Sequence, residues 1–173
     1  MVGGYVRQVG LVLLCGALLL LIACSDQTSS NAFTGYVTKI EGHRALVINP
    51  GSRSINPSNP EYYEAVWVSS VPSKIKVGQQ VQVWFAGNEI ATSYPGQGKA
   101  AKVTVIQTSK PDKADLAQDE VIRKALLNEG IASLQYLVIK DVSYDEITDS
   151  WTIRYRGAMD ASSEVRDFQV PDQ

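Results

Sequence analysis

Apolar and polar positions alternate over much of the chain after residue 32, and this alternation predicts a series of short strands. The clearest case is residues 80–86, where Val81, Val83 and Phe85 share one face and Trp84 falls on the other. A period of two is typical of a strand with one buried and one outer face. Similar alternation, or enrichment in aromatic and β-branched residues, predicts strands at residues 33–40, 44–48, 64–69, 80–86 and 99–108.

The segments between these strands carry turn and loop signals. Glu41-Gly42-His43 predicts a hairpin turn, and the three prolines of residues 49–61 predict a long loop. A bend and a second loop are predicted at residues 71–78 and 87–98. Five short strands with no intervening helix are typical of a partly open Greek-key barrel of the oligonucleotide/oligosaccharide-binding (OB) type. We therefore predict an OB-like five-stranded β-barrel domain over residues 33–109.

The pattern becomes helical after residue 114. Asp115, with Gln118 three residues later, predicts a capped helix start, and Gly130 predicts the helix end. The helix carries one apolar stripe, which needs a surface to pack on. Strands predicted at residues 134–142, 150–156 and 164–170 provide that surface. The predicted fold class is therefore mainly β with an α+β C-terminal part, in which a helix packs on a small antiparallel sheet.

The charge of the chain changes where the pattern changes. Residues 25–109 hold 7 basic and 5 acidic side chains, whereas residues 110–173 hold 8 basic and 13 acidic ones. The change falls at residues 109–113, a polar, proline-containing stretch that is suited to a linker. We predict a domain boundary there, so that residues 110–173 form an acidic α+β unit.

The N-terminal residues have the pattern of a targeting segment. Arg7 precedes an apolar stretch that is short for a membrane-spanning helix, and the stretch ends in Leu21-Ile22-Ala23-Cys24. This run resembles the bacterial lipobox, in which the cysteine is acylated and the chain is cleaved before it. We predict a lipoprotein signal peptide over residues 1–23, a lipid anchor on Cys24, and a lipidated tether over residues 24–32. The predicted location is the extracytoplasmic face of the cell membrane.

The cysteine count and the net charge argue against several kinds of site and partner. Cys15 leaves with the signal peptide and Cys24 carries lipid, so no disulfide, thiolate metal site or cysteine nucleophile is expected. Loss of Arg7 leaves 15 basic and 18 acidic residues, a net charge of −3. Because a nucleic-acid-binding protein normally presents a clustered basic face, no nucleic-acid partner is expected.

Several short motifs together resemble a known family. They are Gly35-Tyr36-Val37, Ala65-Val66-Trp67, Val77-Gly78-Gln79-Gln80-Val81, Trp84-Phe85-Ala86-Gly87 and Ser93-Tyr94-Pro95-Gly96-Gln97. The segment of about residues 33–106 is similar to the YobA-like domain of unknown function (DUF3221 type), found in lipoproteins of Bacillus and related bacteria. The resemblance implies an OB-like barrel at a Gram-positive cell surface. It implies no catalytic residue and does not extend to the acidic second unit.

The loop at residues 93–98 and two tryptophans are the candidate ligand-binding residues. Tyr94 and Gln97 would present an aromatic ring and an amide at the barrel mouth, and Trp67 and Trp84 would add a stacking surface for a sugar or peptide. The competing interpretation is structural. Pro95 and a positive φ at Gly96 would make the loop a type II turn, and aromatic residues in a small barrel often pack.

Other reactive residues are explained more simply. His43 is the only histidine and is expected to be a solvated turn residue, since metal sites need several ligands. The acidic residues around Asp145 lack the spacing of a calcium loop, and Ser93 lacks a nucleophile-elbow sequence. Arg154 and Arg156 suit either an anion site or a solvated strand face. We expect no catalytic residue, no metal and no cofactor, and therefore no enzymatic activity.

Two functional hypotheses from different classes remain. The first is a non-catalytic binding module for a cell-envelope component, a peptide or a protein partner. The alternative is a regulator or inhibitor of an exported peptidase, because the order of helix and hairpin in residues 110–173 is loosely similar to PepSY-type modules.

Overall fold

The computed structural model describes residues 32–54, 61–160 and 164–173, and the predicted signal peptide and Cys24 lie outside these ranges. In the described ranges no helix combines the length and the apolarity that crossing a membrane requires. The elements, in chain order, are β1 (Phe33–Glu41), β2 (Arg44–Arg53), β3 (Tyr62–Ser69), β4 (Gln80–Phe85), the short 3-10 helix η1 (Ala86–Asn88), β5 (Gly96–Val105), α2 (Gln118–Ala125), α3 (Glu129–Ala132), β6 (Leu137–Asp145), β7 (Ser150–Gly157) and β8 (Arg166–Pro171).

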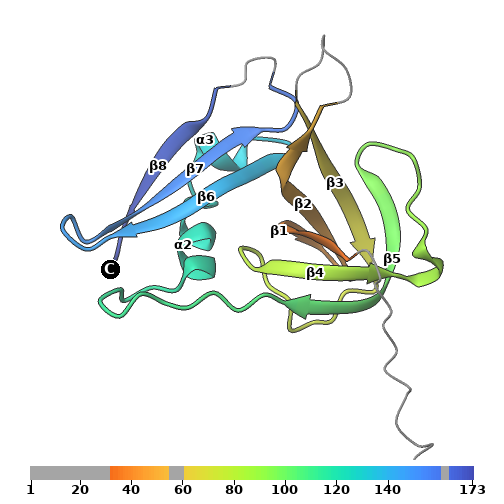
Figure 1. Cartoon of the computed structure of the whole chain (residues 1–173), viewed down its shortest axis with the longest axis horizontal. Coiled ribbons are helices and arrows are strands. Elements are labelled where there is room, and N and C mark those ends of the chain that lie inside the picture. The colour runs from red at the N-terminus through yellow and green to blue at the C-terminus, as the bar shows by residue number, and fades with distance from the viewer. Residues whose placement is uncertain (1–31, 55–60, 161–163) are drawn as a thin grey trace, which may run out of the picture. The chain divides into compact units, whose positions relative to one another are not determined.

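The first five strands form a closed barrel in the order β1-β2-β3-β5-β4, with β1 also paired to β4 (Figure 1). The pair β3–β5 is parallel and the other pairs are antiparallel. The barrel interior is filled mainly by valines, which the alternation of each strand directs inward. The prediction of an OB-like five-stranded barrel is therefore confirmed, although the barrel is closed rather than partly open.

Strand β2 is longer than the sequence predicts. A loop was expected from Asn49 onward because of the prolines, but β2 continues to Arg53 and pairs there with Tyr62 of β3. The pairing register shifts between Ile48 and Ser52. Such an irregularity tolerates Pro50, which has no N–H to donate to the neighbouring strand. The expectation of a loop beginning at Asn49 is therefore wrong.

The outer face of β2 and β3 is also buried. Leu46, Ile48, Tyr63 and Ala65 form a cluster with Val138 of β6, separate from the barrel interior. Burial of both faces explains why the β2 positions from Ala45 to Ile48 are all buried rather than alternating. The cluster joins the barrel wall to the C-terminal sheet, and residues 31–173 group as one compact unit.

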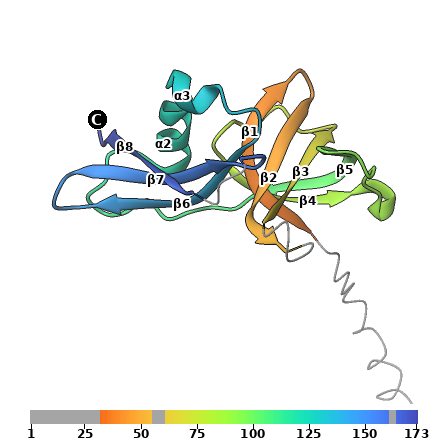
Figure 2. The same cartoon turned by 90° about the horizontal axis from the view of Figure 1, so that it is seen from above.

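The last three strands form an antiparallel sheet in the order β6-β7-β8. Figure 2 shows α2 and α3 on one face of this sheet. The stripe Val121, Ile122 and Ala125 of α2 packs against Trp151 and Ile153 of β7 in a shared core. The prediction of a helix packed on a small antiparallel sheet is confirmed.

The ends of the helical region differ from the prediction. Helix α2 begins at Gln118 with Ala117 as the N-cap residue, and the Glu120 carboxylate accepts the Ala117 backbone N–H at 2.8 Å. Asp115 is not the cap, because the helix begins three residues after it, at Gln118. Its backbone N–H donates to the carboxylate of Asp172. Gly130 does not end the helix either, since it lies inside α3.

Candidate functional site

Trp67 lies on the outer face of the barrel beside two polar side chains. Its neighbours Val66 and Val68 point into the barrel core, so alternation along β3 places the indole outside. The Arg44 guanidinium carbon lies 4.5 Å from the Trp67 ring centroid. Gln97 is the register partner of Trp67 in the parallel β3–β5 pair. We call Arg44, Trp67 and Gln97 the β3–β5 face.

The Arg44 guanidinium is held in place from two sides. It stacks on Trp67 and donates from Nη2 to Glu41 Oε2 at 2.7 Å. Lys39 Nζ lies 3.1 Å from the other Glu41 oxygen. The hydrogen bonds from Arg44 and then from Lys39 hold the pKa of Glu41 below its usual range. Two cations therefore share one carboxylate, which leaves a net positive charge at this end of the barrel.

An open pocket of about 600 Å³ lies next to this charge. Its lining residues are Glu41, His43, Arg44, Ser69, Ser70 and Val71. Most of the guanidinium N–H groups of Arg44 remain for a ligand, because an arginine carries five and one donates to Glu41. The arrangement suits an anionic or hydrogen-bonding group of a ligand, with the indole supplying apolar contact.

Tyr94 lies close to this face but is engaged in packing. Its ring centroid lies 5.6 Å from that of Tyr62 and 5.3 Å from that of Tyr136. Its hydroxyl donates to the Tyr63 carbonyl at 3.2 Å. Burial, with smaller contributions from Tyr62 and Tyr136, raises the pKa of Tyr94 to about 12. Tyr94 and Trp67 both pack against the cluster on the outer barrel wall.

The loop before β5 is not the predicted type II turn. The Tyr94–Pro95 peptide bond is cis, and Gly96 is not among the glycines with positive φ. Gly96 instead begins β5 and pairs with Val66, which requires an extended backbone. The Ser93 hydroxyl donates to the Pro95 carbonyl at 2.8 Å, so this serine is engaged within its own loop.

Trp84 is separated from the other three candidate residues. It also lies on the outer face, with Lys102 Nζ 4.7 Å from its ring centroid. Its register partner on β5 is Lys102, five positions beyond Gln97. At about 3.3 Å per residue, five positions span roughly 17 Å. Trp84 and Lys102 therefore form a second, independent pair of an aromatic ring and a cation.

The remaining residues considered for chemistry have local roles. His43 is exposed in the β1–β2 turn. In the β6–β7 hairpin, Asp149 accepts the Tyr144 hydroxyl, Asp145 accepts the Ile147 N–H, and Glu146 pairs with Lys113. The part of the chain that the structure describes holds no group of three or more His, Cys, Asp or Glu residues suited to a metal ion.

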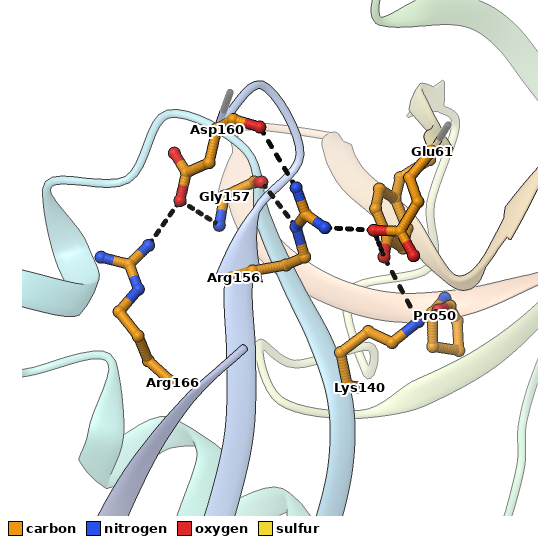
Figure 3. A network of polar contacts seen from close by, with 8 residues as sticks. Pro50, Glu61, Lys140, Arg156, Gly157, Asp160 and Arg166 are labelled. Carbon is orange, nitrogen blue, oxygen red and sulfur yellow. Dashed lines mark hydrogen bonds and ion pairs between the residues drawn. The ribbon is translucent and has the colours of Figure 1, made fainter. Parts of the chain in front are cut away.

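The arginine at position 156 is in a polar network that the sequence did not predict (Figure 3). Its side chain is only 3% exposed, so it is not on a solvated strand face, and it pairs with Glu61 next to β3. It also donates to the carbonyls of Gly157 and Asp160. The Asp160 carboxylate in turn accepts the Gly157 N–H and pairs with Arg166. No local signal indicated this network, because Glu61 lies 95 positions away in the sequence.

On the barrel side the network includes a buried tyrosine. The Tyr63 hydroxyl donates to Glu61 Oε2 at 3.0 Å. Lys140 Nζ donates to the Pro50 carbonyl at 2.8 Å and lies over the Tyr63 ring. These contacts link β2 and β3 with β6 and β7, so the network joins the barrel to the C-terminal sheet.

Comparison with known proteins assigns the barrel alone. Residues 34–107 match the family described as protein of unknown function (DUF3221). No curated protein and no solved structure matches the chain. The matched residues coincide with the five strands of the closed barrel and exclude the helix-and-sheet region. The barrel of this chain therefore matches a DUF3221-type domain, whose function is unknown.

Proposed function

We propose that this chain is an extracytoplasmic lipoprotein that is anchored through Cys24 and binds a cell-envelope component, peptide or protein partner without catalysing a reaction on it. The anchoring part rests on the sequence around Leu21-Ile22-Ala23-Cys24. The binding part rests on one observation, the Arg44 guanidinium stacked on Trp67 at the rim of an open pocket.

The side chains of the β3–β5 face are already positioned for binding. Arg44 is restrained by both Trp67 and Glu41, so little side-chain entropy is lost when a ligand engages it. Gln97 is exposed in register with Trp67 and offers both a donor and an acceptor. A partner with phosphate or carboxylate groups, as in wall polymers and acidic peptides, fits this set of side chains.

Cosedimentation of the full chain with purified cell wall tests the binding part. We expect Trp67→Ala and Arg44→Gln each to weaken binding about tenfold, the size of one substantial interface contact. Trp84→Ala is the matched control, because Trp84 also lies on the outer face beside a cation. Binding that survives both changes at the β3–β5 face, or falls equally with Trp84→Ala, contradicts the proposal.

Mass spectrometry of the protein isolated from cells tests the anchor. We expect a mature chain that begins at Cys24 and carries acyl groups, and Cys24→Ser should release the protein from the membrane fraction. An unmodified Cys24 with residues 1–23 still attached contradicts the anchoring proposal and leaves the binding test unaffected.

A further inference from the structure

A second cavity lies between the barrel wall and the segment that runs from α3 to β6. Its volume is about 560 Å³, within the range of pockets that hold small molecules. One wall comes from β1 and β2, and the other from α2, α3 and the residues that lead into β6. The lining residues are Thr38, Lys39, Ile40, Leu46, Val77, Leu126, Ile131, Ala132, Ser133, Leu134, Gln135 and Leu137.

Eight of the twelve lining residues are apolar, and the base of the cavity is well packed. Leu46, Ile131 and Leu137 belong to the cores that lie beneath it and are almost fully buried. Ile40, by contrast, is one of the few large apolar side chains that the described residues leave exposed. Contact with an apolar ligand would remove this surface from water and stabilise the complex.

The three uncharged polar side chains of the lining already have partners. The Thr38 hydroxyl donates to the Leu46 carbonyl, and the Ser133 hydroxyl donates to the Gly130 carbonyl. The Gln135 amide donates to the Tyr136 hydroxyl. Because each of these side chains already makes one hydrogen bond within the protein, a ligand in the cavity gains little from carrying many polar groups of its own.

Only one lining residue is charged. Lys39 supplies that charge, and no carboxylate is among the lining residues. Lys39 pairs with Glu41, but Glu41 also accepts a shorter bond from Arg44. If an anionic group binds Lys39, the Glu41 carboxylate still pairs with Arg44, so neither charge is left unpaired.

We infer that this cavity binds a free long-chain fatty acid, with the aliphatic chain among the apolar lining residues and the carboxylate at Lys39. A peptide is a poorer match, since each of its residues brings an N–H and a C=O that need partners. A phospholipid with two chains would need a wider apolar volume than one chain. This inference goes beyond the proposed function, because the cavity lining includes none of Arg44, Trp67 and Gln97. The two sites are linked, since Lys39 of the lining and Arg44 share the Glu41 carboxylate.

The test uses membranes that contain the full chain, incubated with palmitate that carries a photoreactive diazirine. After irradiation, the labelled residues are located by mass spectrometry. We expect labels within residues 38–46 and 131–137, and we expect an excess of unmodified palmitate to remove them. Labels confined to residues 1–31 would show only contact with membrane lipid and would overturn the inference.

A matched pair of variants tests whether the label reports the cavity. Ala132 lines the cavity but is exposed, so Ala132→Trp adds bulk there without replacing a buried side chain. We expect it to reduce cavity labelling about tenfold. Leu127→Trp places the same ring at a position that is 83% exposed and outside the lining, and it should leave labelling unchanged. Equal labelling in all three proteins overturns the inference.

A second pair tests the role of charge. Lys39→Gln should weaken palmitate labelling about threefold, the usual worth of one exposed ion pair. The same change should not affect labelling by the methyl ester of the probe, which has no carboxylate. Lys74→Gln, in the exposed turn before β4, is the control. An equal effect of Lys39→Gln on acid and ester would contradict the assigned position of the carboxylate.

Discussion

The barrel and the helix-and-sheet region are stabilised in different ways. In the barrel each strand pairs on both sides, and the interior is aliphatic, with Val37, Val68 and Val83 fully buried. In the second region the sheet has two outer strands, and polar contacts make key connections. The carboxylate of Asp172 accepts three hydrogen bonds, and Arg156 ties β7 to the barrel.

This difference indicates which region has a stability that depends on the ionisation of its side chains. Apolar burial and strand pairing do not depend on protonation, so the barrel should keep its stability over a wide range of pH. The second region relies on ionised groups at Asp172 and at the Arg156–Glu61 pair, so its stability should fall when those groups are removed or neutralised.

The largest expected effect is at the junction of the two regions. Arg156→Ala removes a buried cation and leaves the carbonyls of Gly157 and Asp160 without this donor. We expect a loss of about 3–5 kcal/mol in the free energy of unfolding, measured by urea denaturation of the full chain. Arg154→Ala on the same strand is the control and should cost less than about 0.5 kcal/mol, because Arg154 is exposed and lies 3.7 Å from Asp167. Similar losses for the two variants would show that burial does not set the strength of the contact.

The second-largest loss of stability is expected from a change inside the barrel. A Cβ atom at Gly35 would lie 2.5 Å from the backbone oxygen of Ile48, so Gly35→Ala would force β1 and β2 apart. We expect a loss of about 2–3 kcal/mol, by the same urea measurement, with no change in its dependence on pH. Gly51→Ala is the matched control, since its nearest contact is the Asn49 side chain at 3.1 Å. An equal loss in the control would contradict the close approach at Gly35.

The smallest expected effect concerns pH. Burial by itself raises the pKa of Asp172, but hydrogen bonds from the Asp115 and Leu116 N–H groups and from the Trp151 indole outweigh it and lower the pKa below 3.8. The ionised carboxylate therefore adds stability above pH 3.8, and this contribution is lost as the pH falls through the lowered pKa. We expect Asp172→Asn to lower Tm by about 5 °C at neutral pH and by progressively less below pH 3.8. A constant difference in Tm across this range would show that the charge of Asp172 is not what stabilises the fold.

The positions of the strands along the sequence could be predicted, because each strand has a local signal. Alternation around Val81 and Val83 identified β4, and the turn at Gly42 identified the β1–β2 hairpin. The start of α2 could not be predicted in the same way. The N-cap is Ala117, whose backbone N–H donates to the Glu120 carboxylate. Asp115 has the sequence pattern of a cap, but its backbone N–H donates to Asp172 near the C-terminus.

The candidate site was predictable only in part, for a related reason. Alternation placed Trp84 on an outer face, and Trp67 was expected to share a stacking surface with it. The two rings are in fact separated, because the distance between them depends on the register of β5 with two different strands. Arg44 was missed because its contact with Trp67 crosses between β2 and β3. Alternation gave one usable hint, since it places Arg44 on the same face of β2 as Leu46.

Closure of the barrel also determines which strands can pair with a strand of another molecule. A closed ring of strands offers no free edge, so intermolecular strand addition, the first step of many aggregation processes, has no starting point there. The outer strand β8 is the contrasting case, and it carries Arg166, Asp167 and Pro171. Charged side chains and proline at an edge discourage pairing with a second chain, so this strand protects the more exposed sheet against self-association.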